Sequence, residues 1–369
     1  MASKTASDRI RVGIIGVGNC CAGLVQGIEY YRRHPDEEIV GLMHRRIGRY
    51  SIFDIDFVSA FDVGANKVGK PLWQAVYEEP NLVRWLTLLK TGNRAVVMEA
   101  PILDGVGIYV ENRIKPLKHP TKPDLLRARI LEHLARTRTE VLVNYLPVGS
   151  QQATEFWAGV ALEAGCAFVN CIPVFIASHA RWVREFEAKR IPVIGDDIKG
   201  QIGATIVHRL LAWLVGARGS KINRTYQLNV GGNTDFLNMK EIARLTSKKI
   251  SKTKAVQSQI AHAIGADNIH IGPSDFIPFL GNTKLAYIRL EGKLFANVPF
   301  NIETRLEVDD KANSAGVVID AIRIARLARD RGVGGALPAA SAYFMKHPAK
   351  QMSDDEARRH LDLFIRGRA

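Results

Sequence analysis

Four lysines stand close together in the stretch SKKISKTKAV, residues 247–256, which contains no aspartate or glutamate. They are Lys248, Lys249, Lys252 and Lys254. Ammonium groups bind phosphate, stabilise an oxyanion, and carry protons when neighbouring positive charges lower their pKa. If the stretch is helical, Lys248 and Lys252 lie on one face, while Lys249 and Lys254 point elsewhere into solvent. The cluster alone is compatible with a solvated surface, a polyanion site or an active site.

A second candidate is the turn GVG at residues 16–18, which follows an apolar run and precedes a helical pattern. Glycines here let a pyrophosphate approach the backbone, and the helix N-terminus offers free N–H groups and the positive end of its dipole. The third glycine of the usual fingerprint is replaced by Cys21, so a tight turn in an unrelated α/β protein is the alternative. The predicted cofactor contacts from this turn are Gly16, Gly18, Asn19 and Cys20.

Two further segments end predicted strands and extend this candidate site. Asp62 directly follows the predicted second strand, residues 57–61. An acid at this position binds the adenosine ribose and favours NAD over NADP. Asp62 nevertheless lies farther from the glycine turn than the usual ~20 residues. The stretch NYLPVGS, residues 144–150, lies at the sheet edge where a doubly wound fold binds its ligand. It adds Pro147, Gly149 and Ser150 as predicted NAD contacts, with helix capping as the plainer role of Ser150.

The elements that must position these residues follow from hydrophobic patterning. Short apolar runs alternate with helical stretches such as residues 151–164, which is typical of a parallel, doubly wound sheet. From about residue 200 the pattern changes to a long helix at 202–215 and alternating segments that suit an antiparallel sheet with one wet face. We therefore predict an α/β fold, a Rossmann-type doubly wound parallel sheet plus a second α+β domain. The predicted parallel strands are residues 9–17, 57–61, 95–98, 141–143, 167–169 and 192–194; the alternating segments are 225–230 and 284–291.

An amphipathic helix is expected at residues 317–331, stopped by Gly332. Its apolar residues recur at helical spacing, and the arginine row Arg323, Arg326 and Arg329 is expected to face water. This row therefore has a structural explanation and is assigned no functional role.

Composition narrows the class of protein. A chain of 369 residues with 47% hydrophobic content predicts about two globular domains. No apolar run approaches the ~18 residues of a membrane span, and the four cysteines show neither disulfide nor metal spacing, which favours a reducing cytoplasm. The net charge of +14 comes from dispersed basic residues without an aromatic-interleaved RNA motif or zinc spacing. A nucleic-acid or membrane partner is therefore not expected.

Several segments together resemble the myo-inositol-1-phosphate synthase family, also called inositol-3-phosphate synthases, in its shorter prokaryotic form. The likeness runs from the glycine turn to about residue 350. The segments that carry it are GDDIK (195–199), NVGGNTDFLN (229–238), SKKISKT (247–253), HIGPSDFIPFLGNTKLAYIRLEG (270–292), NSAGVVIDAIRIAR (313–326) and ASAYFMKHP (340–348).

This resemblance implies an NAD-dependent, redox-neutral isomerisation of D-glucose 6-phosphate to 1D-myo-inositol 3-phosphate. Carbon 5 is oxidised, carbon 6 loses a proton, the enolate closes the ring on the carbon 1 aldehyde, and carbon 5 is reduced again. It implies an NAD-binding Rossmann domain at 9–200, a catalytic and tetramerisation domain at 201–309, and a segment at 310–369 that returns to the first domain. It also implies a cytoplasmic homotetramer. A divalent or monovalent cation is a further candidate cofactor, although no residue spacing identifies its ligands.

The resemblance also implies the site residues. The lysines that match catalytic positions are Lys248, Lys252, Lys284 and Lys346. Lys248 is assigned to the hydride step at carbon 5, Lys252 and Lys284 to phosphate or oxyanion contact, and Lys346 to the cyclising carbonyl. The matching acids are Asp235 and Asp310 in the catalytic set and Asp197, with Gly200, among the cofactor contacts. Helix capping by Asp197 or Asp235, and a surface charge pair of Asp310 with Lys311, are the plainer alternatives.

Two other functions compete with this interpretation. A conventional two-domain NAD-dependent dehydrogenase of a small anionic substrate would share the glycine turn and the lysine-rich site, but would produce NADH. A basic polyanion-binding protein would keep its function without Lys284 and would lose affinity steeply with salt.

Overall fold

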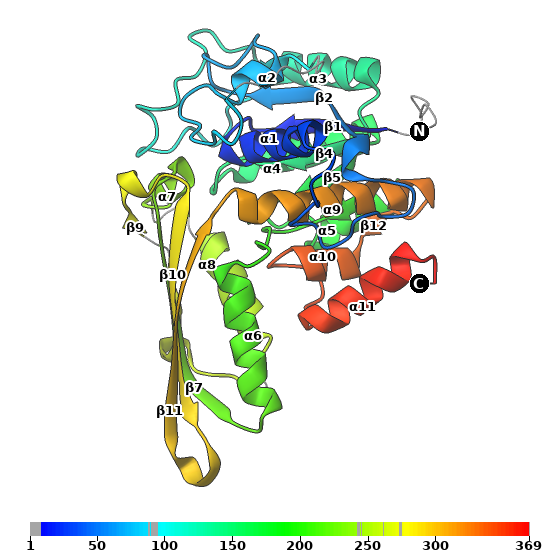
Figure 1. The fold of residues 1–369 in the computed structure, drawn as a ribbon. Coiled ribbons are helices and arrows are strands. Elements are labelled where there is room, and N and C mark those ends of the chain that lie inside the picture. The colour runs from blue at the N-terminus through cyan, green and yellow to red at the C-terminus, as the bar shows by residue number, and fades with distance from the viewer. Residues whose placement is uncertain are drawn as a thin grey trace.

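The computed structural model describes residues 9–87, 89, 95–241, 244, 246–260, 262–272 and 275–368. Figure 1 shows a sheet covered by helices and a long β arm that extends from it. None of the helices in these ranges combines the length and the apolar character that a membrane crossing requires.

The first sheet is parallel throughout its seven strands, in the order β12-β6-β5-β4-β1-β2-β3. β4, β5 and β6 are buried along their whole length, as expected for a sheet covered on both faces. The chain moves outward from β1 to β3 and then returns to the other side of β1, so a ligand-binding switch point lies between β1 and β4. The strands are β1 Ile10–Ile15, β2 Ile55–Asp62, β3 Val97–Glu99, β4 Val141–Asn144, β5 Ala167–Asn170, β6 Pro192–Ile194 and β12 Gly335–Ala336.

Helices cover both faces of this sheet because alternate strand residues point to opposite sides. On one face the buried side chains of α1, α9 and α10 pack on Val12, Val143 and Val169. On the other face α3, α4 and α5 pack on Leu142 and Phe168. The helices are α1 Asn19–Arg33, α2 Leu72–Ala75, α3 Pro123–Thr137, α4 Gln151–Ala164, α5 Ala180–Ala188, α9 Ala312–Asp330, α10 Pro338–Phe344 and α11 Asp354–Ile365.

The second sheet forms the arm. β7 Lys221–Gly231, β10 Thr283–Lys293 and β11 Pro299–Asp309 pair antiparallel, while the short strands β8 Ile269–Ile271 and β9 Asp275–Phe276 run parallel to β7. The helices α6 Ala204–Ala217 and α8 Thr246–Gln257 close one face around Ala286, Ile288 and Leu290. The remaining elements are α7 Thr234–Asn238 and 3-10 turns at Ile52–Asp54, Ala266–Asn268, Pro278–Leu280 and Phe295–Asn297.

The predicted fold class is confirmed, and each predicted strand and helix is found within a few residues of its expected bounds. The physical reason is that apolar periodicity follows directly from which faces of an element are buried.

The expectation that the arginine row of α9 faces water is wrong. Arg323 is fully buried, pairs with Asp320, and donates to the backbone oxygen of His44 at 2.7 Å. Arg326 pairs with Glu140, and Arg329 donates to the backbone oxygen of Gly165. The loop after α1 and the strand ends cover this side of the helix, so its arginines satisfy buried carbonyl and carboxylate groups.

Candidate active site

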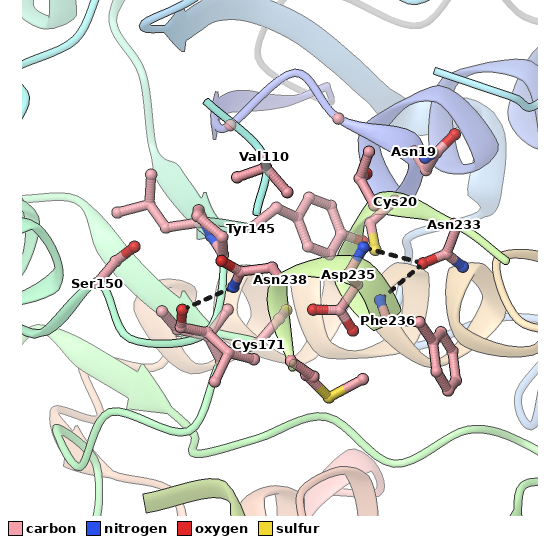
Figure 2. Close-up of a pocket in the computed structure, with 18 of the residues that line it drawn as sticks. Asn19, Cys20, Val110, Tyr145, Ser150, Cys171, Asn233, Asp235, Phe236 and Asn238 are labelled. Carbon is pink, nitrogen blue, oxygen red and sulfur yellow. Dashed lines mark hydrogen bonds between the residues drawn. The ribbon is translucent and has the colours of Figure 1, made fainter. Parts of the chain in front are cut away.

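A cavity of about 280 Å³ lies where the carboxyl ends of β1, β2, β4 and β5 meet the base of the β arm. It is at the switch point of the first sheet, where an open α/β fold binds its ligand. Figure 2 shows Asn19 and Cys20 of α1, Tyr145 after β4, and Asn233, Asp235 and Phe236 of the second region around one space. Every predicted site residue lines this cavity except Gly149.

The glycine turn leaves room for a ligand at the start of α1. Gly16 has φ +92°, and a Cβ there would lie 2.8 Å from the backbone oxygen of Tyr145. A Cβ at Gly18 would meet nothing within 4 Å, and no side chain caps the helix that Gly18 begins. Free N–H groups at an uncapped helix start, next to open space, suit a pyrophosphate.

Asp62 holds the turn in place. Its Oδ2 accepts from the backbone N of Val17 at 2.7 Å, and its Oδ1 accepts from Gly64 N at 2.8 Å. Lys67, which the sequence did not single out, is buried below the turn and donates to Val17 O at 2.8 Å. It comes from a loop whose path no local sequence signal indicates.

The segment after β4 only partly matches its prediction. Pro147 and Ser150 line the cavity, but the side chain of Arg244 covers Gly149, with Cγ 2.7 Å from the place of a Cβ. Ser150 precedes α4 without capping it through its side chain. Asp104 does so instead, because its carboxylate accepts from Gln152 N at 2.9 Å and Ala153 N at 2.8 Å.

The lysine stretch is helical, and α8 turns one face to the cavity. Lys248 and Lys252 line the cavity, whereas Lys249 and Lys254 are exposed. Lys284 lies on β10, and Lys346 follows α10; both line the same cavity. Ammonium groups from three distant segments of the chain therefore meet in one space.

The three predicted acids lie among these lysines. Asp197, after β6 and almost fully buried, accepts from Lys346 Nζ at 2.9 Å and from Ser251 Oγ at 2.7 Å. The Oδ2 of Asp235 is 3.9 Å from Lys248 Nζ, and the Oδ1 of Asp310 is 3.5 Å from Lys284 Nζ.

The plainer alternatives for these acids do not describe their positions. Asp197 has φ +62° and no helix follows it directly. Asp235 stands in the first turn of α7, whose cap is Asn233. The side chain of Asp310 is only 17% exposed, so its contact with Lys311 is not a surface pair. Gly200 lines the cavity next to Asn313, whose side-chain nitrogen would be 2.6 Å from a Cβ at this position.

The surroundings move the lysine pKa values in different directions. Burial, together with the charges of Lys248, Lys284 and Lys346, holds the pKa of Lys252 well below its ordinary value. Burial also lowers the pKa of Lys346, although Asp197 opposes this. For Lys248, burial acts downward but Asp235, Asp197 and Asp310 outweigh it and raise the pKa. The cavity thus contains lysines suited to accept a proton and a lysine suited to keep one.

Sequence reasoning missed other polar groups of the cavity. Lys311 lines it with a side chain that is only 4% exposed. Asn233 caps α7 and also donates from Nδ2 to Asp310 Oδ2 at 3.4 Å. The sequence indicated Asp235, not Asn233, as the possible cap of this helix, and the run DDK at 309–311 has the pattern of ordinary surface charge.

The family described as myo-inositol-1-phosphate synthase matches residues 203–311, which contain α6, α8 and β10. The chain is 50% identical to the inositol-3-phosphate synthase of Mycolicibacterium smegmatis over 98% of this chain and 99% of that protein. It is also 50% identical to the inositol-3-phosphate synthase of Mycobacterium tuberculosis H37Rv, over 100% of this chain and 98% of that protein.

A solved structure shows the same fold at lower identity. The myo-inositol-1-phosphate synthase-related protein from Thermotoga maritima superposes with a TM-score of 0.82 at 22% identity, covering 97% of this chain and 98% of that one. Identity at half of the aligned positions over nearly the full length of both chains confirms the resemblance found in the sequence. This chain belongs to the myo-inositol-1-phosphate synthase family.

Proposed function

We propose that the protein converts D-glucose 6-phosphate into 1D-myo-inositol 3-phosphate, with NAD as cofactor and no net redox change. The observation that carries this proposal is the meeting of lysines from α8, β10 and the end of α10 with an open glycine turn in one cavity. The names of the relatives at 50% identity support the same reaction.

NAD fits the end of the cavity formed by α1. Gly16, Gly18 and the uncapped start of α1 would hold its pyrophosphate, and Asp62 would accept a ribose hydroxyl. Bound NAD supplies the acceptance and return of a hydride at carbon 5 of the sugar.

The lysines divide the remaining chemistry. The directions of the pKa shifts favour proton transfer by Lys252 and Lys346, since both are lowered. Lys248 keeps its charge and, with Lys284, holds the phosphate or the oxyanion that forms as carbon 6 loses its proton. This division differs from the one the resemblance implied, which gave Lys248 the hydride step and Lys252 a contact with phosphate.

A bound cation fits these residues poorly. Among the described residues, no group of three or more His, Cys, Asp or Glu side chains could hold a metal ion. Both oxygens of Asp310 already face ammonium groups, those of Lys311 and Lys284. No step of the proposed reaction therefore passes through a metal.

We also propose that the protein is a homotetramer assembled through residues 201–309, with residues 9–200 binding NAD and residues 310–369 returning to that part. Large apolar side chains are exposed on the arm: Leu228 and Tyr287 face each other on β7 and β10 and are 43% and 40% exposed. Leu210, Trp213 and Leu214 are exposed on α6. Large apolar side chains exposed in groups of this kind are typical of protein interfaces. The four free cysteines agree with a cytoplasmic location.

Incubation of the purified protein with D-glucose 6-phosphate and NAD, followed by NMR of the product, tests this function. The expected result is an inositol phosphate without lasting accumulation of NADH. An oxidised sugar phosphate with stoichiometric NADH would identify a conventional dehydrogenase and contradict the proposal.

A further inference from the structure

Lys311 is a buried cation of the cavity that the family resemblance did not assign. It immediately precedes α9, and its Nζ donates to Asp310 Oδ2 at 2.8 Å. A buried ammonium normally shares its donors among several acceptors. Among the described residues, Asp310 accepts from this ammonium group, which leaves two of its three N–H donors for a bound ligand.

Lys311 lies at the end of the cavity that α1 forms, where NAD is proposed to bind. A Cβ on Gly23 of α1 would lie 3.3 Å from the Cβ of Lys311, so the lysine packs over the first turns of that helix. Its charge also acts on the thiol of Cys20, in the first turn. Lys311 therefore stands next to the helix start at which a pyrophosphate would bind.

The charge of Lys311 is permanent at neutral pH. Burial opposes ionisation, but the carboxylates of Asp310 and Asp235 outweigh it and raise the pKa of Lys311 above its ordinary value. Two other carboxylates that line the cavity are also paired with ammonium groups: Asp235 lies near Lys248, and Asp197 accepts from Lys346. A divalent ion at Asp310 would have to displace Lys311 and then sit among several positive charges.

We propose that Lys311 is a fixed cation that binds a phosphate oxygen of the dinucleotide and takes the place that a bound metal ion would otherwise fill beside Asp310. This inference rests on the proposed function in one respect, since it takes NAD as the dinucleotide. Under this proposal, Lys311 and not a metal ion neutralises the phosphate charge.

Titration of NAD into Lys311→Met, followed by tryptophan fluorescence, measures the loss of this charge at nearly constant side-chain length. We expect the Kd for NAD to rise by about 10-fold or more, because a charged hydrogen bond usually contributes at least this much to affinity. Lys311→Arg should stay within about 3-fold of the wild type because the charge remains. Lys249→Met is the matched control, an exposed lysine of α8 whose loss should leave NAD affinity unchanged.

Chelation tests, on the wild-type protein, whether Lys311 takes the place of a metal ion. Treatment with EDTA, followed by titration of Mg²⁺ or K⁺, should alter neither NAD affinity nor turnover of the wild type. In Lys311→Ala, where Oδ2 of Asp310 loses its ammonium partner, the same cations should partly restore NAD affinity.

Two results would overturn the proposal: wild-type NAD affinity that falls on chelation and returns with Mg²⁺, or a folded Lys311→Met with unchanged Kd. Circular dichroism establishes folding, and the chelation arm decides alone if the Met variant unfolds. If NAD binding depends on Lys311 but no inositol phosphate forms, the inference about Lys311 is supported and the proposed function is contradicted. If the product forms normally and Lys311→Met has an unchanged Kd for NAD, the proposed function is supported and the inference about Lys311 is contradicted.

Discussion

Lys248 and Lys252 lie one turn apart on the same face of α8, yet their surroundings move their pKa values in opposite directions. Lys248 faces three carboxylates, whereas Lys252 is buried mainly among other ammonium groups. Residue type and spacing therefore bring both lysines to the site, and the distribution of neighbouring charges separates their roles.

Lys252→Ala should lower kcat by ~100-fold or more, the usual worth of a positioned proton carrier. NAD affinity and the melting temperature should change little, because the side chain lies among the other site lysines and, within the described part of the chain, makes no contact that holds the glycine turn. Steady-state kinetics and NAD titration measure both effects, with Lys249→Ala as the control on the exposed face of the same helix. A Lys252→Ala enzyme with wild-type kcat would remove this lysine from the proton-transfer step.

α8 is held in position by a buried cluster of charges. The guanidinium of Arg209 on α6 donates to Ala255 O of α8 at 2.6 Å and to Asp354 Oδ2 of α11 at 2.9 Å. Lys199 donates to the other oxygen of Asp354 at 2.7 Å, and burial lowers the pKa of Lys199 to about 8. Asp354 thus connects the C-terminal helix to the helix that carries the site lysines.

Asp354→Ala should leave Arg209 and Lys199 buried without their anionic partner. Losing one partner of a buried ion pair costs about 3–5 kcal/mol, so the free energy of unfolding should fall by this amount, and kcat should fall because α8 loses its support. Urea unfolding and kinetics measure these changes. Asp355→Ala, an exposed acid one residue further along α11, is the control; equal losses in both variants would refute a specific role for Asp354.

His208 links α6 to β7 and should make the arm sensitive to acid. It is fully buried against Thr225 and Gln227, and burial lowers its pKa to about 4. The folded state therefore binds this proton less readily than the unfolded state, whose histidine has a pKa of ~6.5. The resulting stability is present above pH ~6.5 and is lost as the pH falls towards 4, up to about 3 kcal/mol.

Urea unfolding at pH 7 and near pH 4.5 measures this loss. His208→Gln retains hydrogen-bonding groups without a titrating one, so it should show a smaller difference in unfolding free energy between the two pH values. An identical pH dependence in the variant and the wild type would show that His208 does not titrate as described.

At the level of the whole molecule, the site exists only because distant parts of the chain return to one cavity. α9 leaves the arm and packs on α1, which brings Lys311 next to the glycine turn, and the segment after α10 brings Lys346 to Asp197. The arm itself exposes the apolar pair Leu228 and Tyr287, which a monomer would leave in water.

Leu228→Glu combined with Tyr287→Glu should convert the proposed tetramer into a smaller species, because two carboxylates desolvated in an interface oppose association. Size-exclusion chromatography with light scattering measures the mass. Leu125→Glu, an equally drastic change at an exposed position of α3, should leave the assembly intact. A double variant that remains a tetramer would exclude this face of the arm as the interface.

The sequence by itself determined the order of strands and helices, the glycine turn and the helical face of α8, because these depend on local periodicity and backbone freedom. It did not reveal that Arg323 is buried, that Asp104 rather than Ser150 caps α4, or that Arg244 covers Gly149. Nor did it distinguish Lys311 from a surface charge. Tertiary structure decided these points, because burial and pKa depend on which distant segments surround a side chain, and local spacing does not record those neighbours.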